Sequence, residues 1–240
     1  MNEWLTRTEL LLGKDVLQKL KSANVLIAGL GGVGGYAAEM ICRAGIGAMT
    51  IIDGDIVLPS NRNRQLLALK STEGFPKSEI MAMRMRDINP GIRLTIIQEY
   101  IKDERMTEIL DAGFDYVVDA IDTLSPKMFL IYHSLSRKFP VVSSMGAGGK
   151  FDPTRIRISD ISETTDCKLA RILRKRLHRL GIREGFTSVY SPELVDKNKV
   201  IPSTGEPNKA SVIGTISYMP AAFGIACASV VIRDLAGIGR

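Results

Sequence analysis

A glycine-rich segment near the start of the chain has the residue types and spacing that hold phosphate groups. Residues 29–34 read Gly-Leu-Gly-Gly-Val-Gly, after an apolar run and before a helical pattern. In such a loop Gly29 permits a tight turn, Gly31 lets a phosphate approach the backbone, and Gly34 lets helix and strand pack closely. Gly32 belongs to the same loop, and the following helix N-terminus favours an anion. A glycine-rich turn without a ligand is the alternative, but the strand-loop-helix context favours nucleotide binding.

An acidic residue follows this loop at the spacing of a ribose ligand. Asp53 ends the second apolar run, about 20 residues after the loop, where its carboxylate can accept hydrogen bonds from ribose hydroxyls. Asp55 is either a further contact of this kind or a solvated turn residue. These features fit NAD and ATP equally.

Polar side chains farther along the chain favour ATP. Adenylyl transfer builds negative charge on the α-phosphate and on the departing pyrophosphate, so it needs placed donors and a metal ion. A nicotinamide site needs no fixed set of cations. The candidates are a cationic clamp, two neutral donors and a Mg²⁺ carboxylate: Arg64 and Lys77, Asn61 and Gln65, and Asp122. Singly these would be surface charges or a helix cap, but together they predict an ATP site.

Alternating strands and helices must position these residues. Short β-branched or apolar runs predict buried parallel strands at 24–29, 49–53, 93–98, 115–119 and 140–144. Helical spacing predicts helices at 34–43, 77–88, 105–112 and 126–138. This order predicts an α/β fold with a Rossmann-like, doubly wound, mostly parallel sheet that binds ligands at the carboxyl ends of its strands.

The pattern changes after Gly149. Residues 155–161 predict an extra strand, 168–180 a basic helix, and 185–209 a polar loop that we expect to be mobile. We expect one domain over residues 1–240, with the basic helix and loop at about 165–210 as an insertion.

Composition indicates a soluble globular protein. The chain has 240 residues, 45% of them hydrophobic, and a formal charge of +6 that is compatible with an anionic partner. Three cysteines without CxxC spacing argue against a disulfide framework and a four-thiolate zinc site. The charged residues in the first 12 positions argue against a signal peptide, so we expect a cytoplasmic protein.

The apolar C-terminal segment raises the question of a membrane span. Residues 210–235 are long enough for one, since about 20 apolar residues are needed. Gly214, Ser217, Pro220, Gly224 and Ser229 interrupt the segment. We therefore expect a buried core or dimer helix.

These motifs together resemble the ThiF, MoeB and HesA superfamily, whose members adenylate carboxylates, over nearly the whole chain. The resemblance implies a ThiF-type adenylation domain that uses ATP and Mg²⁺. Arg7 in RTELLLG resembles an arginine that reaches the nucleotide of the neighbouring subunit, which implies a homodimer. Residues 218–235 resemble the superfamily's C-terminal core helix.

A second segment resembles one subgroup of this superfamily. Residues 146–149 read GAGG, 152–154 read DPT, and Ser159-Asp160 follows. This pattern is similar to that of tRNA N6-threonylcarbamoyladenosine dehydratases. The resemblance implies adenylation of the threonyl carboxylate, followed by ring closure that releases AMP without an enzyme cysteine. The segment after Gly185 departs from some members, because it lacks a cysteine and a longer insertion.

The predicted basic helix favours tRNA as a partner. Seven cationic residues lie between positions 168 and 183, and the next acidic residue is Glu184. A merely solvated helix face would usually mix both signs. We therefore expect Arg174, Lys175 and Arg176 to contact the tRNA backbone.

Other functions stay open from the sequence. The rival adenylating function acts on the C-terminal glycine of a ubiquitin-like sulfur carrier and implies sulfur-relay proteins as partners. Cys167 is the one candidate nucleophile for such a relay, because Cys42 and Cys227 lie in apolar helices. An NAD-dependent oxidoreductase and a nucleotide-sensing tRNA-binding module are the remaining alternatives.

Overall fold

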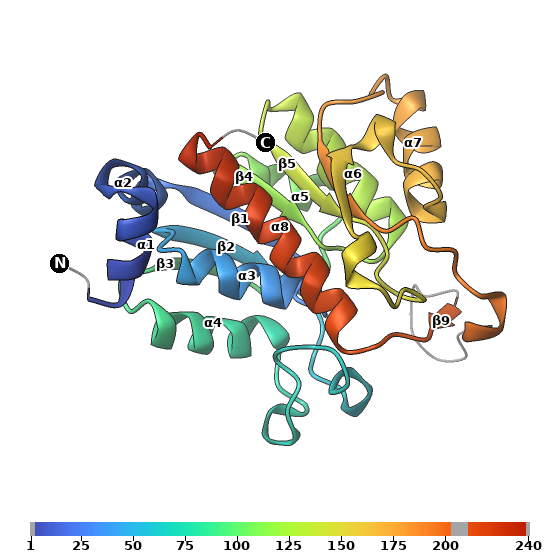
Figure 1. The fold of residues 1–240 in the computed structure, drawn as a ribbon, viewed down its shortest axis with the longest axis horizontal. Coiled ribbons are helices and arrows are strands. Elements are labelled where there is room, and N and C mark those ends of the chain that lie inside the picture. The colour runs from blue at the N-terminus through green and yellow to red at the C-terminus, as the bar shows by residue number, and fades with distance from the viewer. Residues whose placement is uncertain (1–2, 203–210, 239–240) are drawn as a thin grey trace.

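One twisted sheet organises the chain (Figure 1). The computed structural model describes residues 3–202 and 211–238. The sheet has seven strands in the order β3-β2-β1-β4-β5-β7-β6, and neighbouring strands run parallel except β6 and β7. The strands are β1 (Asn24–Ala28), β2 (Ala48–Ile52), β3 (Arg93–Ile97), β4 (Tyr116–Asp119), β5 (Val141–Ser144), β6 (Arg157–Asp160) and β7 (Thr187–Tyr190).

The carboxyl ends of the central strands lie at one edge. Ala28 of β1 pairs with Ile52 of β2 and with Asp119 of β4, so these three strands end at the same level. The chain order reverses between β1 and β4, because β2 and β3 lie on one side of β1 and the later strands on the other. In open α/β sheets ligands bind at this kind of switch point.

Helices cover both faces of the sheet. Figure 1 shows α3 and α8 in front of the sheet and α5 and α6 behind it. The buried apolar residues form two corresponding clusters, in which α4 belongs with α3 and α8, and α7 with α5 and α6. The helices are α1 (Thr6–Leu12), α2 (Lys14–Ser22), α3 (Gly34–Arg43), α4 (Lys77–Ile88), α5 (Asp103–Leu110), α6 (Leu124–Ser136), α7 (Lys168–Arg179) and α8 (Tyr218–Ala236). The doubly wound α/β fold predicted from the sequence is confirmed.

Helix α8 is apolar because it packs against α3 and against strands β4, β5 and β7. It has the length and composition of a membrane span, but Phe223, Cys227 and Val230 have no exposed surface. A Cβ added to Gly224 would lie 2.4 Å from Val33 O, so glycine lets α8 approach the start of α3 closely. The expected core helix therefore supports the glycine loop that precedes α3.

The predicted elements of the first 150 residues are present with shifts of at most two residues at their ends. The prediction of a polar loop over 185–209 is wrong at residues 187–190, which form β7 inside the main sheet. The sequence does not indicate this strand because Thr187 and Ser188 are polar, and a buried strand is usually recognised by a continuous apolar run. The same range contains β8 (Val200–Pro202), which pairs with β9 (Ser211–Ile213). The expected mobility of this loop falls partly on 203–210, outside the described residues.

Candidate active site

The glycine loop packs against the end of β4. Gly29 has a φ of 90°, and a Cβ there would lie 2.7 Å from Ala120 O. A Cβ on Gly34 would lie 1.7 Å from Gly29 O, so neither position accepts a side chain. At Gly31, in contrast, the nearest atom to an added Cβ is Gln65 Nε2 at 3.9 Å. The backbone at Gly31 is therefore open to a ligand, beside the N-terminus of α3.

Asp53 ties this loop to the end of β2. Its Oδ2 accepts a hydrogen bond of 2.6 Å from Leu30 N, and its Oδ1 accepts one of 2.8 Å from Asp55 N. Burial raises the pKa of Asp53, while the positive charge of Lys77 and the two amide donors oppose that rise. A carboxylate oxygen accepts more than one hydrogen bond, so Asp53 retains acceptor capacity for a ribose hydroxyl.

Lys77 and Asp55 form an ion pair beside Asp53. Only 3% of Lys77 is exposed, and its Nζ lies 2.6 Å from Asp55 Oδ2. The Lys77 amide also donates to Asp55 O at 3.0 Å, which fixes the start of α4 against the loop after β2. Asp55 is therefore more than a solvated turn residue, because it holds the ammonium group of Lys77 in place.

The segment from Asn61 to Gln65 brings further polar groups to the glycine loop. Arg64 is half-buried, and its Nη1 donates to Ser60 O and to Asn63 Oδ1. The backbone O of Arg64 would lie 3.4 Å from a Cβ on Gly32. Gln65 Oε1 is buried and has no hydrogen-bond partner among the described residues. This oxygen could accept a hydrogen bond from a ligand, because a buried acceptor without a partner destabilises the protein.

Asn61 has a structural contact of its own. It is buried, and its Oδ1 accepts a hydrogen bond of 3.1 Å from Leu58 N. The side chain thus fixes the turn from which Arg64 and Gln65 project. Its role as a neutral phosphate donor stays a prediction.

Asp122 is exposed just beyond the end of β4. The turn that carries it is held by a buried network that was not predicted from the sequence. Lys127 Nζ lies 2.7 Å from Asp119 Oδ2 and donates to Ile121 O at 3.0 Å, and Ser143 Oγ donates to the same carboxylate oxygen at 2.6 Å. The ion pair therefore fixes the turn that lies against Gly29 and leads to Asp122.

A sequence signal for this network does exist. Lys127 precedes the apolar run Met128 to Ile131 in a helical pattern, and Asp119 ends an apolar strand. Charged residues on the buried side of two neighbouring elements require partners, since isolated buried charges are very unfavourable.

These residues lie together at the switch point of the sheet, and comparison with known proteins assigns the chain to a family. The profile of the ThiF family matches residues 5–240. The chain belongs to the ThiF family. A tRNA threonylcarbamoyladenosine dehydratase of Bacillus subtilis is 42% identical over 188 residues, which cover 78% of this chain and 74% of that protein.

Other relatives and solved structures agree with this assignment. The dehydratase of Escherichia coli is 42% identical over 170 residues, but the chain matches only 63% of that protein's length. A crystal structure of the E. coli dehydratase in complex with ATP has a TM-score of 0.89 at 34% identity and covers 99% of this chain and 96% of that one. A molybdopterin-synthase adenylyltransferase of Salmonella typhimurium is 36% identical over 52% of this chain and 50% of its own length.

One predicted residue of this ThiF-family chain lies away from the others. Arg7 is exposed on α1, and Leu5 just before it packs against Gly45 beyond the end of α3. The ten residues of α3 separate that end from the glycine loop by about 15 Å. In Figure 1, α1 and α2 lie at one end of the molecule. The structure therefore does not bring Arg7 to the site within one chain.

The basic helix of this ThiF-family chain has two kinds of cation. Arg174 Nη1 donates to Thr164 O at 2.7 Å, to Ile161 O at 3.2 Å and to Thr164 Oγ1, so this side chain fixes the turn before α7. Lys175 and Arg176 are exposed. The three residues predicted to contact tRNA are therefore not equivalent.

The described cysteines are all buried. Burial raises the pKa of Cys42 and of Cys227 to about 12, so both thiols stay protonated at neutral pH. Cys167 is also buried, at the start of α7. None of the three is placed as an accessible nucleophile.

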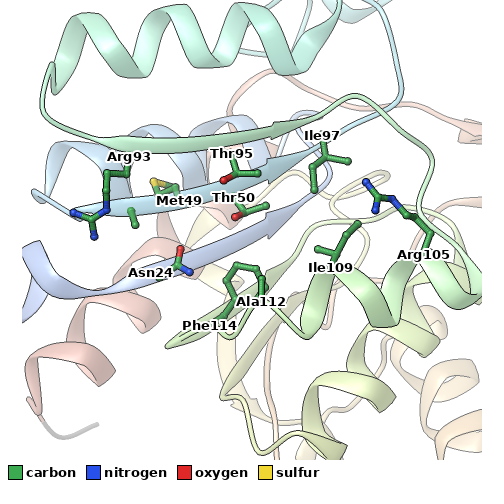
Figure 2. A pocket seen from close by; sticks show the side chains of 11 residues that line it. Asn24, Met49, Thr50, Arg93, Thr95, Ile97, Arg105, Ile109, Ala112 and Phe114 are labelled. Atoms are coloured by element: carbon green, nitrogen blue, oxygen red, sulfur yellow. The ribbon is translucent and has the colours of Figure 1, made fainter.

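A hollow of about 470 Å³ lies along β2 and β3 beside α5 (Figure 2). Asn24, Ala48 and Arg93 line it, and each is the first residue of its strand. No residue predicted for the nucleotide site lines this hollow. It is separate from the candidate active site.

Proposed function

We propose that this chain is an ATP-dependent tRNA threonylcarbamoyladenosine dehydratase. The observation that carries the proposal is the meeting of the glycine loop with Arg64, Gln65 and the turn to Asp122 at one edge of the sheet. The dehydratase of B. subtilis, 42% identical over most of the chain, supports the choice of substrate. Residues 1–240 would form one adenylation domain.

ATP would lie with its phosphates at the glycine loop. The open backbone of Gly31 and the N-terminus of α3 favour the anion, and Gln65 Nε2, 3.9 Å from a Cβ on Gly31, would donate to a phosphate oxygen. Asp53 would accept a hydrogen bond from a ribose hydroxyl. Asn61 acts mainly through the turn that it fixes.

The transfer step needs positive charge where negative charge develops. An oxygen of the threonyl carboxylate attacks the α-phosphorus, the bond to the bridging oxygen breaks, and pyrophosphate leaves with that electron pair. Arg64 and Lys77 would stabilise the charge on the phosphates in the transition state. Lys77 is already oriented by Asp55, so little reorganisation is needed.

Mg²⁺ fits this site as a partner of the phosphates. Among residues 3–202 and 211–238, no group of three or more His, Cys, Asp or Glu side chains could hold a metal ion alone. Mg²⁺ is usually held by one or two carboxylates together with phosphates and water, and Asp122 is the carboxylate that would hold it here. When bound, the ion would supply Lewis-acid stabilisation of phosphate charge.

The second step needs no enzyme thiol. A nucleophilic atom of the same modified side chain attacks the activated carbonyl carbon and loses its proton. The bond between that carbon and the oxygen of the adenylate breaks, so a ring forms and AMP leaves with one oxygen of the original carboxylate. The buried cysteines are consistent with this intramolecular route.

The tRNA would approach along α7. Lys168, Arg171, Lys175 and Arg179 are exposed and share one side of the helix, since they are spaced three or four residues apart. Arg176 is exposed as well, whereas Arg174 supports the helix. Phosphate contacts of this kind position the RNA without reading its bases.

The active form would be a homodimer in which Arg7 enters the partner's site. Arg7 is too far from the glycine loop of its own chain to serve it. The adjacent Leu10 and Leu11 are largely exposed on α1, which is the composition of a surface that a second copy covers. The resulting protein would act in the cytoplasm, where tRNA is modified.

The alternative function is adenylation of the C-terminus of a ubiquitin-like sulfur carrier, with sulfur-relay proteins as partners. A molybdopterin-synthase adenylyltransferase is similar to about half of this chain, and this similarity favours the alternative function. The sequence has no CxxC pair, which argues against a sulfur relay.

Pyrophosphate exchange separates these functions. The protein is mixed with ATP, Mg²⁺ and labelled pyrophosphate, and then with either modified tRNA or a carrier protein. We expect label to enter ATP only with the tRNA. Exchange that depends on the carrier instead would favour the alternative, and ATP binding without exchange or AMP release would indicate a nucleotide-sensing module.

A further inference from the structure

An exposed aromatic side chain at the start of α8 lies beside another in the loop after β5. Phe151 is 68% exposed and Tyr218 is 40% exposed, and their ring centroids lie 6.0 Å apart at an angle of 70°. Tyr218 Oη donates a hydrogen bond of 2.9 Å to Phe151 O. The pair is thus held in a fixed arrangement although neither ring is buried.

Glu193 fixes the loop that carries Phe151. The carboxylate of Glu193 accepts hydrogen bonds from Phe151 N at 3.1 Å and from Asp152 N at 3.2 Å. Lys150 is buried, and its Nζ donates to Glu193 O. The loop belongs to the GAGG and DPT segment, which no step of the adenylation chemistry uses.

A hollow of about 250 Å³ adjoins the aromatic pair. Lys150, Phe151 and Lys199 line it, together with the backbone segment that begins at Gly214. The lining thus joins an aromatic ring to the exposed side chain of Lys199, whereas the ammonium group of Lys150 is held by Glu193 O. This combination suits a flat ring that carries an anionic group.

The hollow borders the proposed ATP site. Asn63 Nδ2 donates to Thr215 O at 3.0 Å, which links the wall of the hollow to the residue before Arg64. Pro220, two residues after Tyr218, would lie 2.9 Å from a Cβ on Gly32 of the glycine loop. A ligand on the aromatic pair would therefore lie beside the nucleotide phosphates.

We propose that Phe151 and Tyr218 form a stacking subsite for one unpaired nucleobase of the substrate RNA, with the exposed Lys199 facing its phosphate. Aromatic rings stack on any base, and lysine neutralises the backbone phosphate, which is how single-stranded RNA is commonly held. The inference rests on the proposed function, because it identifies how that site holds the RNA loop. An apolar protein partner would gain little from an exposed lysine at the same hollow.

Fluorescence of a stacked base tests this subsite. The probe is a set of anticodon stem-loop RNAs with the modified adenosine and a single 2-aminopurine at each other loop position, since this base changes its fluorescence when stacked. We expect at least one position to respond when the parent protein binds. Phe151→Ala should remove that response and weaken binding about 5- to 150-fold, the range for loss of one stacked base. Tyr218→Phe, which removes only the hydrogen bond to Phe151 O, should have a smaller effect.

Phe129→Ala is the matched control. Phe129 is also an exposed phenylalanine, but it lies on α6, which packs on the opposite face of the sheet from α8. Phe129→Ala should leave the fluorescence and the affinity for RNA unchanged, and all variants should bind ATP like the parent.

The outcomes separate the two proposals. If Phe151→Ala binds the RNA and changes its fluorescence as the parent does, the subsite is wrong while the dehydratase function stands. If the aromatic pair instead mediates contact between copies, Phe151→Ala will change the oligomeric state without changing RNA affinity per site, which also overturns the subsite. If the parent neither binds the RNA nor releases AMP with it, both proposals fail.

Discussion

The ammonium group of Lys127 lies 2.7 Å from the Oδ2 atom of Asp119, and neither side chain has exposed surface. Both charges are therefore paired inside the protein, where Ser143 and the backbone of residue 121 complete their hydrogen bonds. The pair holds the turn whose Ala120 O would lie 2.7 Å from a Cβ on Gly29. A change at Lys127 should thus lower the stability of the fold, and any effect on ATP binding should be indirect.

Lys127→Met should lower the free energy of unfolding by about 3–5 kcal/mol, because it leaves the Asp119 carboxylate buried without its cation. Urea unfolding followed by circular dichroism measures this loss. The control is Lys70→Met, which breaks the surface pair of Lys70 with Glu73 at 3.2 Å and should cost at most about 1 kcal/mol. If the two variants lose the same free energy of unfolding, the buried pair contributes no more to stability than the surface pair.

Arg64 and Arg62 allow a comparison between two neighbouring arginines. Arg64→Ala should lower kcat for AMP formation about 100- to 1,000-fold, the usual effect of removing one group that stabilises developing charge. Arg62 pairs with Glu73 at 3.2 Å, so Arg62→Ala should leave kcat near that of the parent. Steady-state kinetics at saturating ATP and tRNA measures both. The assignment of Arg64 fails if the two variants lose the same activity.

Much of this site could be predicted from the sequence. The roles of Gly29, Gly31 and Gly34 in the loop geometry follow from their spacing alone, because the turn, the open backbone and the helix packing each need a glycine. The Lys77–Asp55 pair could not be predicted in this way, since a lysine and an aspartate 22 positions apart carry no local signal.

The later part of the chain was harder to predict for a physical reason. Arg174 and Lys175 are neighbours in a basic run, yet one is fixed by carbonyl oxygens and the other is exposed. Charge alone does not distinguish them, because a helix turns each residue by about 100° and only the packing partner decides which one is held. Strand β7 is not predicted for a similar reason, because neighbours distant in sequence bury its polar residues Thr187 and Ser188.

Arg7 and Asp122 should act in the same site although they come from different copies. Arg7→Ala and Asp122→Ala should each remove most activity. An equal mixture that exchanges subunits should recover about a quarter of the parent activity, since half of the dimers are then hybrid and each hybrid has one intact site. The measurement is AMP release after mixing, with the two separate variants as controls. Full activity of a monomeric protein, or no recovery after proven exchange, would contradict the shared site.

The exposed face of α7 should control the affinity for tRNA. Replacing Arg171, Lys175 and Arg179 by Ala should weaken tRNA binding and reduce its salt slope by roughly one unit for each phosphate that is no longer neutralised. The charge-matched control replaces Lys70, Arg86 and Arg93, which are exposed outside α7. Binding isotherms at several salt concentrations give both quantities. The helix is only a solvated surface if the two triple variants behave alike.

The central claim is that this chain converts a modified adenosine in tRNA to its cyclic form with consumption of ATP. The direct test is mass spectrometry of the nucleosides after tRNA that carries N6-threonylcarbamoyladenosine is incubated with the protein, ATP and Mg²⁺. We expect the modified nucleoside to become lighter by one water molecule, with one AMP formed for each conversion, and we expect Asp122→Asn to slow both. An unchanged nucleoside in the presence of active, ATP-binding protein would contradict the account.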